Sequence, residues 1–309
     1  MQRDLRFDGL KFVMILLVVL GHLKFYDYGL NIKKIIYFFH MPIFVFLSGY
    51  FTSLNKSIRE QNKWIKKTLL IYVFAQLAHT LLSKILDEEI TWRLIISPHI
   101  ALWYLVSLLY WRISYWRVFY KCNDIHLFIL SLFLAILSGY IPIDHDFSFQ
   151  RSFAFFPFFV MGVCIKKRRV ISLIDKIPLS VTFICLLIGF VIAFFFPWEF
   201  VPRKHYVFTP EPIIRTIQTV LAIYLCILIL RISKNTLFDK IAKYRQYTLW
   251  IYIGHTYLIR IGKYLFNRYD ISMNIFQAVI LSLVYCCLFI WLADECAKLT
   301  NRCHQHRQK

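Results

Sequence analysis

Residues 10–26 read LKFVMILLVVLGHLKFY, an apolar run whose charged residues, Lys11 and Lys24, stand near its two ends. About 17–25 mostly apolar residues are enough for a helix to cross the hydrocarbon layer of a bilayer. Further apolar runs follow directly, and the small-residue cleavage site of a secretory signal peptide is missing. The run therefore predicts a membrane-spanning first helix that is retained in the protein.

Apolar runs of this kind recur along the whole chain of 309 residues. The composition is 59% hydrophobic and only 17% charged, which is more apolar than soluble domains are. No polar stretch is long enough for a separate soluble domain. We therefore expect an all-α fold, a polytopic membrane helix bundle with about ten transmembrane helices in a single domain over residues 1–309. The predicted spans cover residues 10–26, 35–54, 68–86, 100–119, 125–142, 153–165, 179–196, 213–231, 247–266 and 275–296, and the sixth is short enough to be tilted or partly re-entrant.

The net charge of +20 is concentrated in alternate loops. In a soluble protein this charge would suggest nucleic acid, but an excess of Lys and Arg in alternate loops is what orients a membrane protein. The positive-inside rule places both termini in the cytoplasm, in agreement with an even number of spans. We expect membrane lipid, and no nucleic acid, as a partner. The basic loops lie near residues 3–6, 56–67, 117–121, 166–176, 231–245 and 298–309, and the loops between them hold acidic residues such as Asp87, Asp144, Glu199 and Asp270.

Three polar residues of interest lie in or just before the first run: Asp8, Lys11 and His22. Lys11 and His22 are eleven residues apart, so they share one helix face at an axial separation of ~16 Å. Asp8 lies one turn before Lys11 and can pair with it. A lysine at a helix end is also a common interfacial anchor. An imidazole inside a span is costly, and for His22 the functional interpretation is the default.

Later runs carry further polar landmarks. Pro42 leaves backbone carbonyls without a donor close to His40. Trp103 and Tyr104 by themselves are also typical of an interfacial aromatic belt. Gln76 and His79 in the third run are expected to be buried. The landmarks are His40-Met41-Pro42, Ser48-Gly49-Tyr50, Leu102-Trp103-Tyr104-Leu105 after His99, Arg151 through Gly162, and Ile251 through His255 with Arg260 beyond it.

These landmarks, in this order, resemble the acyltransferase-3 family. Lys11 followed by His22 is similar to that family's Arg/Lys-x10-His signature, with lysine in place of the commoner arginine. The segment from His40 to Tyr50 resembles the branch with fucose 4-O-acetylase-like proteins. The resemblance covers nearly the whole chain and implies a multi-pass protein of the bacterial inner membrane. It implies transfer of an acetyl or other short acyl group from acyl-CoA, a co-substrate rather than a bound cofactor, to a sugar hydroxyl of a cell-surface polysaccharide or its lipid-linked precursor.

The resemblance and the polar landmarks together suggest roles for individual residues. His22 is expected to act as general base on the attacking hydroxyl, with a covalent acetyl-histidine as an open alternative. His40 or His255 would orient His22 or bind the sugar, and Arg151 would hold an acceptor anion or developing negative charge. The remaining candidates are Lys11 as a catalytic cation, Trp103, Tyr104 and Asp8 for substrate binding, and Lys63, Lys66 and Lys67 for the donor.

Other interpretations of the sequence remain open. The same histidines and arginine could line the pathway of a transporter for glycan or acyl intermediates, or belong to a partner subunit of a polysaccharide synthase. His22 and Asp27 match an H-x4-D spacing, which we attribute to chance. Asp144-His145-Asp146 resembles a D-x-D metal site, but two carboxylates make a poor cage. One cysteine and two histidines in the tail, Cys303, His304 and His306, do not complete a zinc site, so we expect no metal.

The charge pattern predicts the sidedness of two loops. A cysteine introduced at Lys167 should be protected from an impermeant thiol reagent in intact cells, and one introduced at Asp144 should be labelled. Mass-tag labelling before and after permeabilisation measures both. Labelling of position 167 from outside would reverse the predicted orientation.

Overall fold

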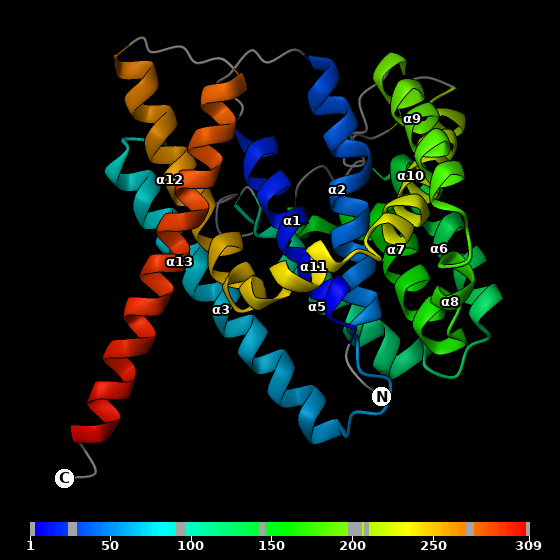
Figure 1. Cartoon of the computed structure of the whole chain (residues 1–309). Helices are drawn as coiled ribbons and strands as arrows, with labels where there is room; N and C mark the ends of the chain where they lie inside the picture. Colours follow the sequence, from blue (N-terminus) through cyan, green and yellow to red (C-terminus); the bar gives the residue numbers. More distant parts are fainter. Residues whose placement is uncertain are drawn as a thin grey trace. The chain divides into compact units, whose positions relative to one another are not determined.

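The computed structural model describes residues 4–23, 30–90, 97–99, 101–141, 146–196, 206, 210–269 and 275–306, with side chains except at 30–34, 146, 275 and 296–306. Every regular element in these residues is a helix (Figure 1). The chain divides into two compact units, and each is described by itself. Unit 1 combines residues 1–30 with 235–309, and unit 2 holds residues 31–234.

Unit 1 brings the two ends of the chain together around its first helix. Helix α1 (Leu5–His22) packs against α11 (Thr236–Ile241), the 3-10 helix η4 (Ala242–Tyr247), α12 (Thr248–Arg268) and α13 (Ile275–His306). Asp4 caps α1 by accepting a hydrogen bond from the Arg6 amide, as N-cap aspartates do. Leu10, Ile15 and Ile251 are fully buried where these helices meet. Apolar packing therefore holds the first helix among the last ones.

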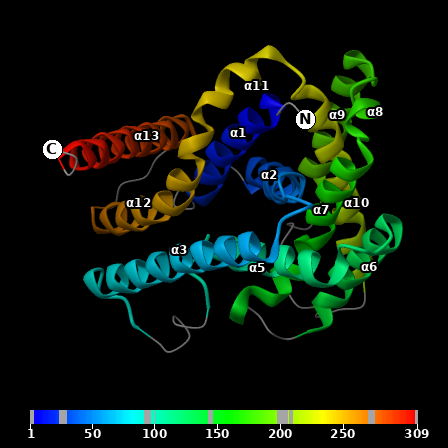
Figure 2. The ribbon, with the colours of Figure 1, turned by 90° about the horizontal axis from the view of Figure 1, so that it is seen from below.

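Unit 2 contains the middle of the chain. Its longer helices are α2 (Leu30–Tyr50), α3 (Ile58–Ile85), α5 (Trp103–Ser114), α6 (Asp124–Leu137), α7 (Phe149–Arg168), α9 (Leu179–Phe195) and α10 (Glu211–Ile232). Short elements connect them: the π-helical turn η1 (Tyr115–Phe119), the 3-10 turns η2 (Ser138–Tyr140) and η3 (Asp146–Ser148), and α8 (Ile171–Ile174). Helix α7 packs against α5 and α6, and α9 lies beside α10 (Figure 2).

Helices lie along the described parts of the ten predicted apolar runs, with two differences in detail. The helix that carries the sixth run is longer than the run itself: α7 has 20 residues, because the polar residues at both ends of the run are also helical. The basic segment before the ninth run, expected as a loop, forms α11 and η4, and Asn235 caps α11 through the Leu237 amide. Turns this short carry too little apolar periodicity to be recognised in the sequence.

Helix α3 shows the inside-out polarity of a membrane helix. Its polar residues Gln76 and His79 are buried, as predicted, whereas Phe74 and Leu77 are 68% and 61% exposed. Gln76 accepts a hydrogen bond from the His99 amide at 3.1 Å and donates one to the Ser97 carbonyl at 3.1 Å. A large apolar surface with a satisfied polar interior suits a helix that faces lipid.

Within the described residues, three helical segments are long and apolar enough to cross a membrane by length and composition. They are Ile58–Ile85, Glu211–Ile232 and Phe276–Glu295. Shorter apolar helices cover Ile35–Tyr50, Asp124–Tyr140 and Leu179–Phe195. These helices are consistent with a helical membrane protein, and the number of ten spans stays a prediction.

Two glycines bring the backbones of α2 and α7 into contact. A Cβ at Gly49 would overlap the carbonyl oxygen of Phe159, and a Cβ at Gly162 would overlap the carbonyl oxygen of Phe46. Small residues at reciprocal positions allow membrane helices to approach closely, where dispersion contacts hold them. The glycines of two sequence landmarks thus share one structural task.

Replacing Gly162 by Leu should destabilise the protein, because the new side chain meets backbone that cannot rotate away. Overpacking typically costs about 1–3 kcal/mol, and backbone overlap belongs at the upper end. Thermal unfolding in detergent should show a lower midpoint. Val191→Leu, which enlarges an exposed side chain on α9, is the control and should leave the midpoint unchanged. Equal unfolding midpoints for both variants would mean that α2 and α7 can move apart without loss of stability.

Candidate active site

Two histidines meet in unit 1, one from each end of the chain. His22 lies in the last turn of α1 and His255 in the middle of α12, with ring centroids 5.4 Å apart and planes inclined by 42°. His255 is fully buried, whereas His22 is only partly buried. A substrate can therefore reach His22 more readily than His255.

The hydrogen bond of His255 fixes the position of its proton. Its Nδ1 lies 2.9 Å from the Ile251 carbonyl oxygen, one turn earlier on α12. Because a carbonyl oxygen only accepts, Nδ1 must carry the proton, and Nε2 then presents a lone pair. Within the described part of the chain, Nε2 is enclosed without a hydrogen-bond partner. A buried polar atom without a partner is costly, which makes Nε2 a candidate for function.

The sequence around Asp8 has a structural task at the other end of α1. Asp8 is 2% exposed and forms an ion pair with Arg245 of η4 at 3.2 Å. A Cβ at Gly9 would overlap the carbonyl oxygen of Phe238, so glycine is needed where α1 crosses α11. Lys11 is partly buried one turn further along. Arg245 was missed in the sequence, since its partner lies 237 residues away.

Arg260 is a second residue to which the sequence assigned no role. It is 8% exposed and lies on the buried face of α12, which also carries Tyr252, His255 and Thr256. A buried cation on a membrane helix marks a functional position by default. The spacing of five residues after His255 was the signal that could have identified it.

In unit 2, two further predicted residues meet. The Arg151 guanidinium lies 5.4 Å from the ring centroid of Trp103, which stacks on Phe155 at 5.3 Å. Ser152 fixes the neighbourhood by sharing a 2.7 Å hydrogen bond with Ser107 and accepting one from Trp111 Nε1 at its carbonyl. The pairing of Arg151 with an indole face matches a cation–π contact.

His40 and Tyr104 lie on two packed helices of unit 2, α2 and α5. His40, Phe44 and Ser48 lie on one face of α2 at four-residue spacing. Tyr104 of α5 contacts the Phe44 ring and the Ser48 hydroxyl. His40 is buried, and its Nδ1 lies 2.5 Å from the Ile36 carbonyl oxygen. His40 therefore has the same proton position as His255. Tyr104 and Ser48 share a hydrogen bond through their hydroxyls.

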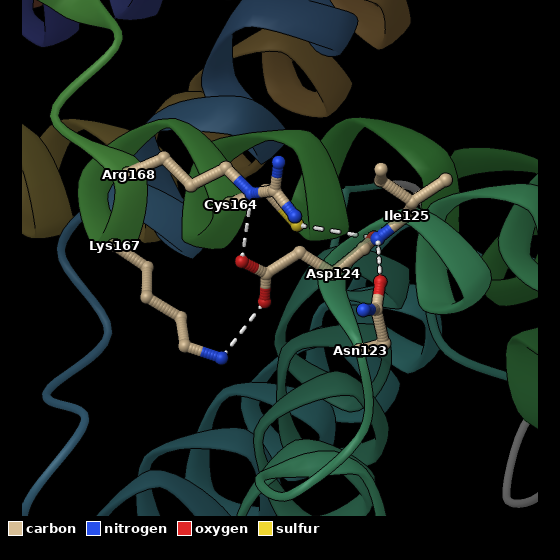
Figure 3. Close-up of polar contacts among 6 residues, drawn as sticks. All are labelled: Asn123, Asp124, Ile125, Cys164, Lys167 and Arg168. Atoms are coloured by element: carbon tan, nitrogen blue, oxygen red, sulfur yellow. Dashed lines mark hydrogen bonds and ion pairs between the residues drawn. The ribbon is translucent and has the colours of Figure 1, made fainter.

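The candidate donor lysines are exposed. Lys63, Lys66 and Lys67 all lie on the outer surface of α3. The second basic cluster differs, because Asp124 at the start of α6 pairs with Lys167 at 2.8 Å and Arg168 at 2.9 Å (Figure 3). Asn123 caps α6 beside this cluster by accepting from the Ile125 amide.

The described residues contain no group of three or more His, Cys, Asp and Glu that could hold a metal ion. Several residues considered as alternative sites in the sequence lie outside the described part of the structure. They are Asp27, Asp144, His145 and the side chains of Asp146, Cys303, His304 and His306.

Comparison with known families defines the class of the protein. The sequence model of a family described as an acyltransferase domain matches residues 4–294, nearly the whole chain. Together with the apolar helices, this match defines a helical membrane acyltransferase. The chain belongs to the acyltransferase-3 family, as its motifs predicted. No curated protein and no solved structure matches it.

The Asp124 cluster predicts how stability depends on pH. Burial raises the pKa of Asp124, but the hydrogen bonds and charges of Lys167 and Arg168 outweigh this and leave the pKa below its ordinary value. A depressed pKa contributes stability that is present above the unfolded pKa of about 4 and is lost as the pH falls through the folded value.

Asp124→Asn should therefore lower the unfolding midpoint at pH 7. The expected loss is about 1 kcal/mol, because both cations are well exposed. The difference from wild type should shrink as the pH falls below about 4, where the wild-type carboxyl is protonated as well. A constant difference from pH 7 to pH 3, measured by thermal unfolding, would contradict the ion pair as its cause.

Proposed function

We propose that this chain transfers an acetyl or other short acyl group from acyl-CoA to a sugar hydroxyl of a cell-surface or exported polysaccharide, or of its lipid-linked precursor. In this proposal it is a ten-span protein of the bacterial inner membrane with both termini in the cytoplasm. It belongs to the fucose 4-O-acetylase-like branch of its family. The distribution of Lys and Arg supports this topology.

The pairing of His22 with His255 is the observation that carries the proposal. Acyl transfer to an alcohol requires removal of the hydroxyl proton as the oxygen attacks the thioester carbonyl. His255 donates through Nδ1 to Ile251, so the lone pair on its Nε2 would be available to accept a hydrogen bond from an N–H of the neighbouring His22 ring. The other nitrogen of His22 would then be a base directed at the hydroxyl. His255 is a positioning residue in this scheme, and His22 is the catalytic residue.

Unit 2, taken by itself, holds groups of the kinds that bind an anion or a sugar. Trp103 offers an aromatic face, and Arg151 beside it offers a fork of N–H donors for an anion or a developing oxyanion. His40 and Tyr104 provide hydrogen-bonding groups in a buried setting. Asp8 forms an ion pair with Arg245. Lys11 lies on the same face of α1 as His22 and is the proposed catalytic cation.

Replacement of His22 by Asn should lower the turnover of acetyl transfer by about 10²–10⁴-fold, the usual contribution of general-base catalysis. The measurement is transfer of labelled acetyl from acetyl-CoA to a panel of glycans by purified protein that elutes as wild type in detergent gel filtration. His126→Asn, which alters an exposed histidine on α6, is the matched control and should leave turnover unchanged.

His255→Asn tests the positioning role separately. The asparagine amide can keep the hydrogen bond to the Ile251 carbonyl but removes the position of Nε2. We expect turnover to fall without a change in the Michaelis constant for acetyl-CoA, because donor binding is untouched. Near wild-type turnover of the His22 variant would remove the histidine from the chemistry and favour a transporter of glycan or acyl intermediates.

A further inference from the structure

Lys166 behaves differently from the two basic residues that follow it. Lys167 and Arg168 both form ion pairs with Asp124 (Figure 3). Lys166 points elsewhere: its Nζ donates to the Thr52 carbonyl at 2.9 Å. Burial and the charge of Arg112 on α5 both lower the pKa of Lys166. Two partly buried cations therefore lie near each other. No carboxylate among the described residues pairs with either of them.

Arg112 is held in place by an aromatic face rather than by a counter-charge. Its guanidinium carbon lies 4.3 Å from the ring centroid of Trp64, and Trp116 packs edge-on against that indole at 5.5 Å. The Arg112 Nε atom is buried without a hydrogen-bond partner in the described part of the chain. Stacking covers one face of the guanidinium and leaves the N–H donors in its plane available.

The surroundings of this pair are fixed by hydrogen bonds from several helices. Trp116 Nε1 donates to the Ser53 carbonyl at 3.0 Å, next to the Thr52 carbonyl that binds Lys166. The π-helical turn η1 carries Trp116 and directly follows the helix of Arg112. Widened turns of this kind are frequent at functional sites. The cations are therefore preorganised rather than loosely placed.

Like charges that repel each other in a partly desolvated setting are expensive unless an anion binds between them. The planar fork of Arg112 matches the oxygens of a phosphate, and Lys166 adds a point charge. Both residues lie at the ends of the helices that lead into the basic loops, on the side predicted to be cytoplasmic. That side is where a soluble phosphorylated donor would arrive.

We propose that Arg112 and Lys166, with Trp64 as the supporting face, form the site that binds the phosphate groups of the acyl-CoA donor. The proposal rests on the proposed function and adds to it a binding site distinct from the exposed lysines of α3. Trp64 stands between those lysines in sequence, yet it turns inward and contacts Arg112. The same phosphate chemistry occurs in anionic lipid headgroups, and the experiment must separate the two sources.

The test is binding of unacylated CoA to the purified protein in neutral detergent free of phospholipid, measured by equilibrium dialysis. Arg112→Gln and Lys166→Gln should each raise the dissociation constant by about ten- to a hundredfold, the range for loss of a charged hydrogen bond. Arg112→Lys should fall in between, since the charge stays and the fork is lost. Lys167→Gln removes an adjacent cation that is already paired with Asp124, and should change binding little.

The outcomes distinguish failure of the proposed binding site from failure of the proposed acetyl transfer. Unchanged CoA affinity in both glutamine variants, with normal gel filtration, overturns the site even if acetyl transfer is found. Weakened binding in both variants supports the site even if no sugar accepts acetyl. If wild-type protein binds phosphatidylglycerol in mixed micelles through Arg112 but does not bind CoA, the donor assignment is wrong.

Discussion

The polar groups of a helix that faces lipid must find their partners inside the protein, because lipid offers none. That constraint explains why α3 buries Gln76 and His79 and exposes phenylalanine and leucine. It also explains why single side-chain hydrogen bonds to carbonyls one turn earlier recur, as at His40, Ser48, Thr52 and His255. Helices satisfy their own backbone, and these side chains use the second lone pair of a carbonyl oxygen.

The same constraint gives meaning to the few groups that remain unsatisfied. Among the described residues, the enclosed side-chain atoms without a hydrogen-bond partner include Gln61 Oε1 and Gln150 Oε1 as well as His255 Nε2 and Arg112 Nε. The last two lie near groups that are partly accessible, His22 in unit 1 and Lys166 in unit 2. His255 Nε2 presents a lone pair beside the titratable ring of His22, and Arg112 Nε is an N–H donor near a second cation, Lys166. The first suits proton transfer, and the second suits the binding of an anion.

Charge by itself is a poor guide to binding in this protein. The run from Lys166 to Arg168 contains three cations, of which two share the carboxylate of Asp124 and one binds the Thr52 carbonyl instead. The exposed lysines of α3 keep their hydration and suit the orientation of the membrane helices. A cation gains binding strength when its surroundings hold it and remove water, as the indole of Trp64 does for Arg112.

The sequence alone determined the helical class and the family and pointed to the candidate histidines, because apolar run length and motif order are local properties. Tertiary structure decided which of these residues meet. His22 and His255 are 233 positions apart in the chain, and no local pattern could predict that their rings lie 5.4 Å from each other. Arg245 as the partner of Asp8, and Arg112 as the neighbour of Lys166, were likewise not predictable. Side-chain direction on a helix depends on which face packs inward, and that is settled only when distant helices come together.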